Sequence, residues 1–480
     1  MKKNKLTFLL YSVLFTHITF GQSNVKLSKA QMYEDYDSLI NKVERVSAHL
    51  EPKKVLWNYD ILQQVKDLRH EIDTITTYDS FWFLVSRALR TCQDGHTRIL
   101  TKNDYFFTLW ENFNVKLPFQ YINGEYLSIK PFAFQGQSFP IGTTAVKFND
   151  QEIHEFMQTV TQYAPAMRYD LNYNRFYDNR FYQNYNILLK GQFSVSFKKP
   201  GGSLTKLNFK ITDSVTIQKS KSIDSIYKIV EFWDEQNVLY IRVPAMDEGD
   251  ISFYRKEIRR QSKGKQIEKI VIDVRDNGGG SNLVWIAIYE ALIASPIKYE
   301  LTLCGNKPDF MPNQYLKSKR INTQKLRTEK YSFLNNKLFF KYQEGNTVLK
   351  PSKKSIKFNG KIFVIGNEYI YSSTGACMRL ANANPTDNII SIGRPTGRFL
   401  GDGYDPLIFK LPNSKIEFIV APAIDMSDAQ TAKDIMHDAY EIIIPYSLQE
   451  FEDILNFSGN IWDKEYLIKY DPFIKTVLEK

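Results

Sequence analysis

The chain has 480 residues, of which 43% are hydrophobic, 14% aromatic and 24% charged, and its formal net charge is +10. This composition is typical of a globular protein with large cores and excludes an intrinsically disordered chain. Basic residues are interspersed with acidic ones and form no stripe, so nucleic acid is not an expected partner. The length allows about two to four domains.

The N-terminus has the pattern of a secretory signal. Three lysines among the first five residues precede an apolar segment over 6–20, and Gly21 follows. A membrane anchor is the alternative interpretation, but the apolar segment is short for a bilayer span. We therefore predict a signal peptide over residues 1–22, export to the periplasm or the extracellular space, and no stable membrane span.

Residues 23–110 are predicted to form an N-terminal helical region. Ser28 begins a capping box, and the apolar residues that follow it have helical spacing. A second helix is expected over about 59–71. A third begins after Thr77 and ends at the turn 91–97, which contains a histidine.

Residues 111–220 predict a small β-rich module, because short β segments alternate there with turn signals. Asn123-Gly124 and Pro200-Gly201-Gly202 are hairpin signals. Aromatic residues between Tyr169 and Tyr185 have helical spacing, which predicts an aromatic helix packed in the module or against a neighbouring domain.

Residues 225–450 alternate strand and helix, which predicts an α/β sheet covered by helices. The clearest apolar strands are expected at 238–243, 269–274 and 362–365. The basic segment 300–360 is predicted to be an insertion in this core. Residues 451–480 are predicted to form a peripheral helical tail.

Three cysteines, Cys92, Cys304 and Cys377, are too few for a disulfide framework, and the sequence does not show whether two of them pair. Cys377 falls inside a predicted helix and is expected to be packed. No zinc-ligand spacing occurs, so neither a metal site nor a cofactor is predicted.

Hydroxyl side chains cluster just after the predicted strand 362–365. Ser372, Ser373 and Thr374 stand where a helix is expected to begin, beside unpaired backbone N–H groups that stabilise a developing negative charge. Such a position suits a nucleophilic serine. Helix capping is the simpler interpretation, because Ser and Thr often accept hydrogen bonds from first-turn amides.

Two other segments supply what a nucleophile needs. Gly278-Gly279-Gly280 follows the strand 269–274, and consecutive glycines let backbone N–H groups point at an oxyanion. Their spacing fits neither common nucleotide-binding loop. His96, in a turn after a helix, is the best placed histidine for a base, since an imidazole suits proton transfer at neutral pH. A structural turn and a structural histidine are the alternatives.

These segments resemble the motifs of a known family and occur in the same order. Asp94-Gly95-His96-Thr97, the strand and glycine loop 273–280 and Tyr371-Ser372-Ser373-Thr374-Gly375 are similar to motifs of carboxy-terminal-processing (tail-specific) and tricorn-type serine peptidases. Segments 393–397 and 411–414 resemble later landmarks of that family. The resemblance implies a crotonase-like α/β catalytic core, and it implies a peptide-binding PDZ-type domain for the β-rich module.

The resemblance also implies roles for individual residues. Ser372 would attack a peptide carbonyl, and a backbone N–H of Gly279 or Gly280 together with that of Ser373 would hold the oxyanion. The expected function is an exported serine peptidase that hydrolyses unfolded or C-terminal protein segments. The alternative is an inactive relative that binds peptides or small apolar ligands, as retinoid-binding relatives of the family do.

The residues expected to act as base and as its acidic partner are where this chain departs most from the family motifs. One branch of the family uses a lysine where this chain has Arg398, which stays protonated. The tricorn-like branch uses a histidine matching His96, so a Ser–His pair is predicted. Gly375 stands where the family has an acidic residue. Candidates for a third catalytic residue are Asp434, Asp438 and Glu441.

Overall fold

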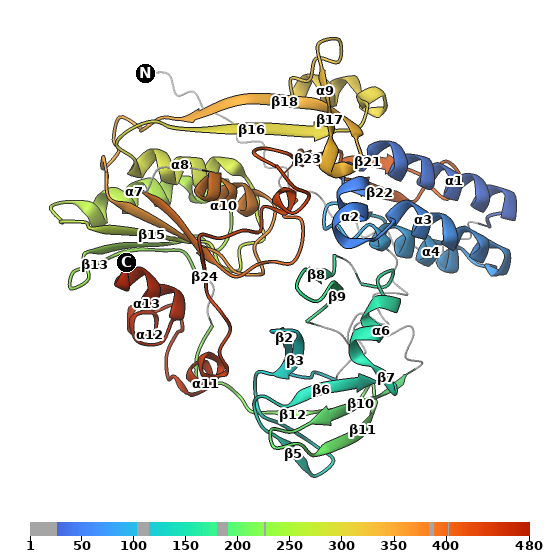
Figure 1. Ribbon diagram of the computed structural model, residues 1–480, viewed down its shortest axis with the longest axis horizontal. Coiled ribbons are helices and arrows are strands. Elements are labelled where there is room, and N and C mark those ends of the chain that lie inside the picture. Colours follow the sequence, from blue (N-terminus) through green and yellow to red (C-terminus); the bar gives the residue numbers. More distant parts are fainter. Residues whose placement is uncertain are drawn as a thin grey trace, which may run out of the picture.

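The computed structural model describes residues 26–102, 115–164, 166–179, 191–224, 227–383, 388–401 and 403–480. Figure 1 shows helices α1 to α4 on one side, a large sheet with its helices on the other, and a β-rich part below them. The C-terminal helices lie beside the large sheet.

The N-terminal region is helical, as predicted. It contains α1 (Lys29–Val46), α2 (Leu50–Trp57), α3 (Ile61–Asp67), the 3-10 helix η1 (Leu68–Thr74) and α4 (Tyr78–Thr91). The capping box is confirmed, because the Ser28 side chain accepts from the Gln31 N–H and the Gln31 side chain accepts from the Ser28 N–H. The helix expected over 59–71 is a short α-helix continued as a 3-10 turn. The helix α2, which is separated from α1 by three residues, was not predicted from the sequence.

The β-rich part is built on a sheet with strand order β11-β10-β6-β3-β2. Its strands are β2 (Phe119–Ile122), β3 (Glu125–Ser128), β6 (Thr144–Phe148), β10 (Gln192–Lys198) and β11 (Leu204–Lys210). Both predicted hairpins are confirmed. Asn123 and Gly124 have φ of 49° and 90°, as the tight turn of a two-residue hairpin requires. The helix α6 (Ile153–Thr159) follows β7 (Gln151–Glu152).

The aromatic helix predicted between Tyr169 and Tyr185 is wrong within the described residues. β8 (Arg168–Asp170) and β9 (Arg175–Tyr177) pair instead as an antiparallel hairpin. Their rings pack on α2, since the Trp57 ring lies 5.5 Å from that of Tyr169 and 5.6 Å from that of Phe176. Aromatic residues suit strands as well as helices, and this tertiary packing decided between the two. Residues 180–190 lie outside the described part.

The core sheet has the strand order β13-β14-β15-β19-β20-β24, and every neighbouring pair except β13 and β14 is parallel. The strands are β13 (Ile229–Trp233), β14 (Val238–Arg242), β15 (Lys269–Asp273), β19 (Lys361–Ile365), β20 (Ile389–Gly393) and β24 (Ile442–Ile443). The helices α7 (Ile251–Ser262), α8 (Asn282–Leu292) and α10 (Ser373–Ala383) share one hydrophobic core with one face of this sheet. The mixed α/β prediction is therefore confirmed.

The tail is helical but not peripheral. The helices α11 (Leu448–Asn456), α12 (Lys464–Lys469) and α13 (Pro472–Glu479) follow the last core strand. Phe473 and Val477 of α13 share a hydrophobic core with Tyr240 and Phe363, on the face of the sheet opposite to α8. The tail thus completes the core, which a helical pattern alone does not reveal.

The segment predicted as an insertion contains a long β arm. β16 (Ile297–Gly305) pairs with β18 (Lys337–Leu349), which also pairs with β17 (Arg327–Tyr331), and the short helix α9 (Asn313–Ser318) lies near the end of the arm (Figure 1). The arm reaches the N-terminal helices, where the Asn306 side chain donates to the Ser47 carbonyl over 3.0 Å.

A second contact joins the N-terminal region to the core near the predicted base. β1 (Arg98–Ile99) pairs with β22 (Glu417–Val420), which pairs with β21 (Leu407–Lys410). Because β1 begins two residues after His96, this pairing joins the end of the histidine turn to a segment that lies between β20 and β24 in the sequence.

No helix among the described residues is long and apolar enough to cross a membrane. Cys92, Cys304 and Cys377 are all free and buried.

Candidate active site

Ser372 lies in a strained turn between β19 and α10. Its φ is +57°, a left-handed conformation that costs free energy in a residue other than glycine. Two backbone hydrogen bonds hold the turn, from the Ser372 N–H to the Leu400 carbonyl over 2.6 Å and from the Ala376 N–H to the Ser372 carbonyl over 3.2 Å. Ser372 is thus fixed directly before the first turn of α10. Its side chain is only half-buried, whereas Ser373 is buried.

The glycine loop after β15 packs directly on this turn. A methyl group added to Gly279 would lie 2.7 Å from the Ser372 Cβ and 3.2 Å from the Ser373 nitrogen. One added to Gly280 would lie 2.3 Å from the Met246 carbonyl oxygen. Both glycines have positive φ, of 106° and 134°. Only glycine allows this approach of the two backbones.

Two asparagines that were not predicted as site residues organise the loop. The buried Asn277 side chain donates to the Val243 carbonyl over 2.8 Å and accepts from the Gly279 N–H over 2.9 Å. Asn367, before the serine turn, accepts from the Asp276 N–H and donates to the Asp276 carboxylate. The Gly279 N–H therefore has an internal partner. Of the two glycines, Gly280 is the better candidate for an oxyanion donor.

The histidine turn reaches the serine turn through Tyr371, the residue before Ser372. The Tyr371 hydroxyl donates to the Asp94 carboxylate over 2.9 Å, and the ring centroids of Tyr371 and His96 lie 4.9 Å apart. The ring also packs on Gly95 and Gly401, where an added methyl group would collide with it. The fold thus brings together two segments separated by 277 positions in the sequence.

Asp94 is the carboxylate of this turn. It accepts from the His96 N–H over 3.1 Å and from the Thr97 hydroxyl over 2.7 Å. Burial alone would raise the pKa of Asp94, but the neighbouring His49, Lys53 and His96 hold that pKa below its ordinary value. Burial and the Asp94 carboxylate together raise the pKa of Tyr371, so its hydroxyl keeps the proton that it donates.

None of the three carboxylates predicted as candidates for a third catalytic residue is bonded to His96 in the described part of the chain. Asp434 accepts from the Gln430 and Thr431 N–H groups, and the Glu441 side chain is exposed. Asp438 accepts from the Thr396 and Gly397 N–H groups, and burial raises its pKa to about 6. Among the described residues, none of their hydrogen bonds reaches His96. The carboxylate that bonds within the histidine turn is Asp94. Its position two residues before His96 is the feature of the sequence that could have identified it.

Two further positions of the sequence pattern are explained by packing. The Arg398 guanidinium lies 4.9 Å from the Tyr371 ring centroid and donates to the Ile370 carbonyl over 3.4 Å. Burial lowers its pKa to about 10, which still leaves it protonated at neutral pH. A methyl group on Gly375 would lie 2.7 Å from the Leu400 Cβ, so an acidic side chain has no room there.

No group of three or more metal-ligating side chains that could hold a metal ion occurs among the described residues.

Residues 237–435, which include the glycine loop and the serine turn, match the family model of peptidase family S41. The part of the chain that carries both of these segments, residues 237–435, belongs to peptidase family S41. It is a serine-type peptidase, and the resemblance to the carboxy-terminal-processing family is confirmed. No curated protein matches the chain in sequence.

Solved structures of CPAF share the fold. Mature CPAF is 12% identical, with a TM-score of 0.54, and the match covers 94% of this chain and 96% of that one. Mature CPAF complexed with lactacystin is 13% identical, with a TM-score of 0.54, and the match covers 94% of this chain and 98% of that one. The likeness therefore extends well beyond the S41 segment, across almost the whole chain.

Proposed function

We propose that this S41 peptidase cleaves peptide bonds with Ser372 as nucleophile and His96 as base. The observation that carries the proposal is the contact of the two turns through Tyr371, whose ring packs on His96 while its backbone continues into Ser372. A base has to come within hydrogen-bond reach of its nucleophile, and this contact brings the two segments together.

In the proposed reaction the Ser372 oxygen attacks the carbonyl carbon of the peptide while His96 takes the hydroxyl proton. The oxyanion that forms is stabilised by the N–H groups of Gly280 and Ser373, since the Gly279 N–H already donates to Asn277. His96 then gives the proton to the leaving amine. Water hydrolyses the acyl-enzyme in the same way, with His96 again taking and returning a proton.

Asp94 favours these proton transfers through its charge. A carboxylate held ionised beside His96 stabilises the imidazolium that forms in each transition state. It also fixes the turn, because it binds the backbone of His96 and the hydroxyl of Tyr371 at once. We propose this role for Asp94 ahead of Asp434 and Asp438, whose carboxylates accept from other groups, and ahead of Glu441, whose side chain is exposed.

A fluorophosphonate probe tests the assignment, because it forms a stable adduct with an activated serine and releases fluoride. We expect an adduct on Ser372 in the wild type, none in Ser372→Ala, and labelling slowed by at least about 10³-fold in His96→Ala. Ser373→Ala is the matched control and should label normally, since alanine keeps the backbone N–H and the Ser373 hydroxyl has no hydrogen-bond partner in the described part of the chain. An adduct on Ser373, or unchanged labelling of His96→Ala, would contradict the assignment.

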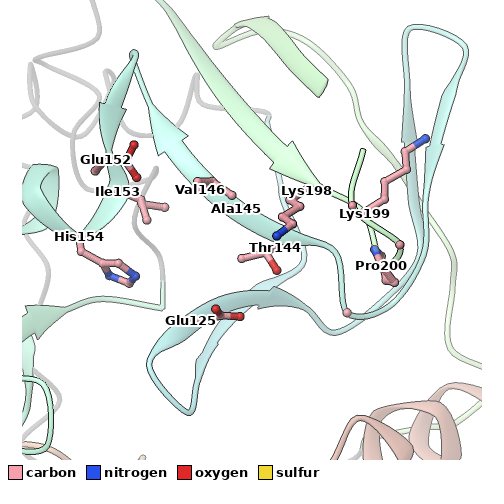
Figure 2. Close-up of a pocket in the computed structure, with 13 residues that line it drawn as sticks. Glu125, Thr144, Ala145, Val146, Glu152, Ile153, His154, Lys198, Lys199 and Pro200 are labelled. Atoms are coloured by element: carbon pink, nitrogen blue, oxygen red, sulfur yellow. The ribbon is translucent and has the colours of Figure 1, made fainter. Parts of the chain in front are cut away.

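We further propose that the β-rich part binds substrate chains in a pocket of about 520 Å³. Figure 2 shows side chains from β3, β6, β7, the start of α6 and the end of β10 around it, including Glu125, Thr144, Glu152, His154, Lys198 and Lys199. Such a site would suit unfolded or C-terminal segments. We expect Lys199→Glu to raise the KM for a long unfolded substrate without slowing fluorophosphonate labelling. Lys206→Glu, outside the pocket, is the control.

Export is the last part of the proposal. It is supported by the basic and apolar N-terminal pattern of residues 1–22. Expression of the full chain and of a chain lacking residues 2–22, followed by fractionation, tests it. Export of both forms, or of neither, would argue against a signal peptide.

The alternative function is an inactive relative that binds peptides or apolar ligands. The internal hydrogen bond of the Gly279 N–H favours it, because one predicted oxyanion donor is occupied. The labelling experiment separates the two, since an inactive binder would form no adduct on Ser372.

A further inference from the structure

A fully buried lysine lies beneath the histidine turn. Lys53, on α2, has 0% of its surface exposed. Its ammonium group donates to the carbonyls of Cys92 and Gln93 over 2.8 and 2.7 Å. The ammonium also lies 5.3 Å from the Trp57 ring centroid and 5.5 Å from that of Phe399.

Burying an ammonium group is costly, and in the described part of the chain Lys53 forms no ion pair within 4.0 Å. Burial accordingly lowers the pKa of Lys53 to about 8, although the Asp94 carboxylate opposes the shift. The other titratable groups that face it are Cys92 and His49, and burial lowers the pKa of His49 to about 4. The charge is therefore met by carbonyl dipoles, aromatic faces and one nearby carboxylate.

The carbonyls that Lys53 binds lie at the C-terminal end of α4. Cys92 is the residue that caps this helix, and Gln93 follows with φ of 50°. The last carbonyls of a helix have no partner within it and carry the negative end of its dipole. The ammonium group of Lys53 donates to these carbonyls and also compensates the negative end of the dipole, where the chain leaves α4.

The side chain of Gln93 fixes the same end of α4 through contacts with the segment after α6. The buried Gln93 amide donates to the Thr161 and Ala164 carbonyls over 2.6 and 3.2 Å, and its oxygen accepts from the Met167 N–H over 2.5 Å. Residues 92–93 are thus clamped between α2 and the segment after α6. Asp94 and His96 follow within three residues, so the clamp sets where they lie.

We propose that Lys53 is a positioning residue, whose ammonium group fixes the turn that carries Asp94 and His96 opposite the serine turn. The proposal rests on the Ser372–His96 function above. Lys53 does not act as the base here, because its ammonium group donates hydrogen bonds to two backbone carbonyls and is not directed at Ser372. Its contribution is to the geometry of proton transfer and not to the binding of substrate.

Saturation kinetics with the fluorophosphonate probe test this role, since they separate the maximal labelling rate from the probe concentration at half saturation. We expect Lys53→Met to lower the maximal rate by about 10²-fold, the cost of a displacement of about 1 Å, and to leave half saturation within about threefold. Lys53→Gln keeps uncharged N–H donors and should restore part of the rate. Lys54→Met is the matched control, because Lys54 is exposed and pairs with Asp60 on the surface.

An NMR signal of the His96 ring, assigned by its loss in His96→Ala, gives a readout that does not depend on activity. It should shift in Lys53→Met and stay in place in Lys54→Met. If the wild type forms no adduct, the catalytic proposal fails while this shift still tests the positioning. If Lys53→Met does not fold, the labelling kinetics and the His96 signal are measured on Lys53→Gln instead. A folded Lys53 variant with wild-type labelling and an unmoved His96 signal would overturn the proposal, as would equal losses at Lys53 and Lys54.

Discussion

The serine side and the histidine side of the candidate site are held in different ways. The serine turn is fixed by backbone, through hydrogen bonds from Tyr371 to Asn277 and from Ser372 to Leu400 and through the close approach of Gly279. The histidine turn is fixed by buried side chains, namely Lys53, Gln93 and Asp94. The first arrangement depends on the presence or absence of a Cβ, the second on individual polar contacts.

This difference predicts how each side fails. A side chain added within the backbone contact of the serine turn has nowhere to go, so the damage should be large and local. Loss of one polar side chain near His96 removes one of several contacts, so the damage should be partial. Substitutions of graded severity test that contrast.

The largest effect is expected from Gly279→Ala. The new methyl group would lie 2.7 Å from both the Ser372 Cβ and the Tyr371 carbonyl oxygen, and φ of 106° is strained for alanine. We expect peptidase activity to fall by about 10³-fold, as when an oxyanion hole is disrupted. Gly278→Ala is the control, because a methyl group there meets nothing within 4 Å. Similar activities of the two variants would contradict the backbone account of the serine side.

A smaller effect is expected from Asp94→Asn. The amide keeps the size of the side chain but loses the charge that stabilises a protonated His96, and it removes the carboxylate nearest to the buried ammonium group of Lys53. We expect kcat to fall by about 10²-fold with little change in KM, measured by steady-state peptide hydrolysis. The same substitution at Asp434, whose hydrogen bonds are local, should leave kcat within about threefold of wild type.

Tyr371→Phe should cost less again. The change removes only the hydroxyl that donates to Asp94, while the ring still packs on His96 and Gly401. One hydrogen bond to a charged acceptor contributes about 1.5–3 kcal/mol, so its loss can lower kcat by roughly 100-fold at most. A larger loss than that of Asp94→Asn would show that Tyr371 does more than connect the two turns.

Replacement of Asp438 should change the free energy of unfolding and leave the turn that carries His96 unaffected. Burial raises its pKa from 3.8 to about 6, so the folded state holds this proton more tightly than the unfolded state between these two values. Its contribution to the free energy of unfolding therefore falls as pH rises through that window, by on the order of 3 kcal/mol. Denaturant unfolding of wild type and Asp438→Asn at pH 4 and pH 7 measures the difference. A gap that widens in favour of wild type at pH 7 would contradict the raised pKa.

The sequence by itself determined the parts of this protein whose signal is local. The capping box at Ser28, the turn at Asn123-Gly124 and the strands before the glycine loop and the serine turn each lie in a few consecutive residues, because backbone conformation and apolar periodicity are short-range properties. The order of the family motifs likewise needed no structure. It predicted Ser372 as the nucleophile and a resemblance to the carboxy-terminal-processing serine peptidases.

Only the tertiary structure decided what depends on distant contacts. The aromatic segment became a hairpin because its rings pack on Trp57, and the tail completed the core because the second face of the sheet has to be covered. The roles proposed for Asp94, Tyr371 and Lys53 rest on contacts between segments far apart in the chain, of which the sequence carries no pattern. The serine side could therefore be predicted from a motif, whereas the buried contacts that hold the histidine side required the fold.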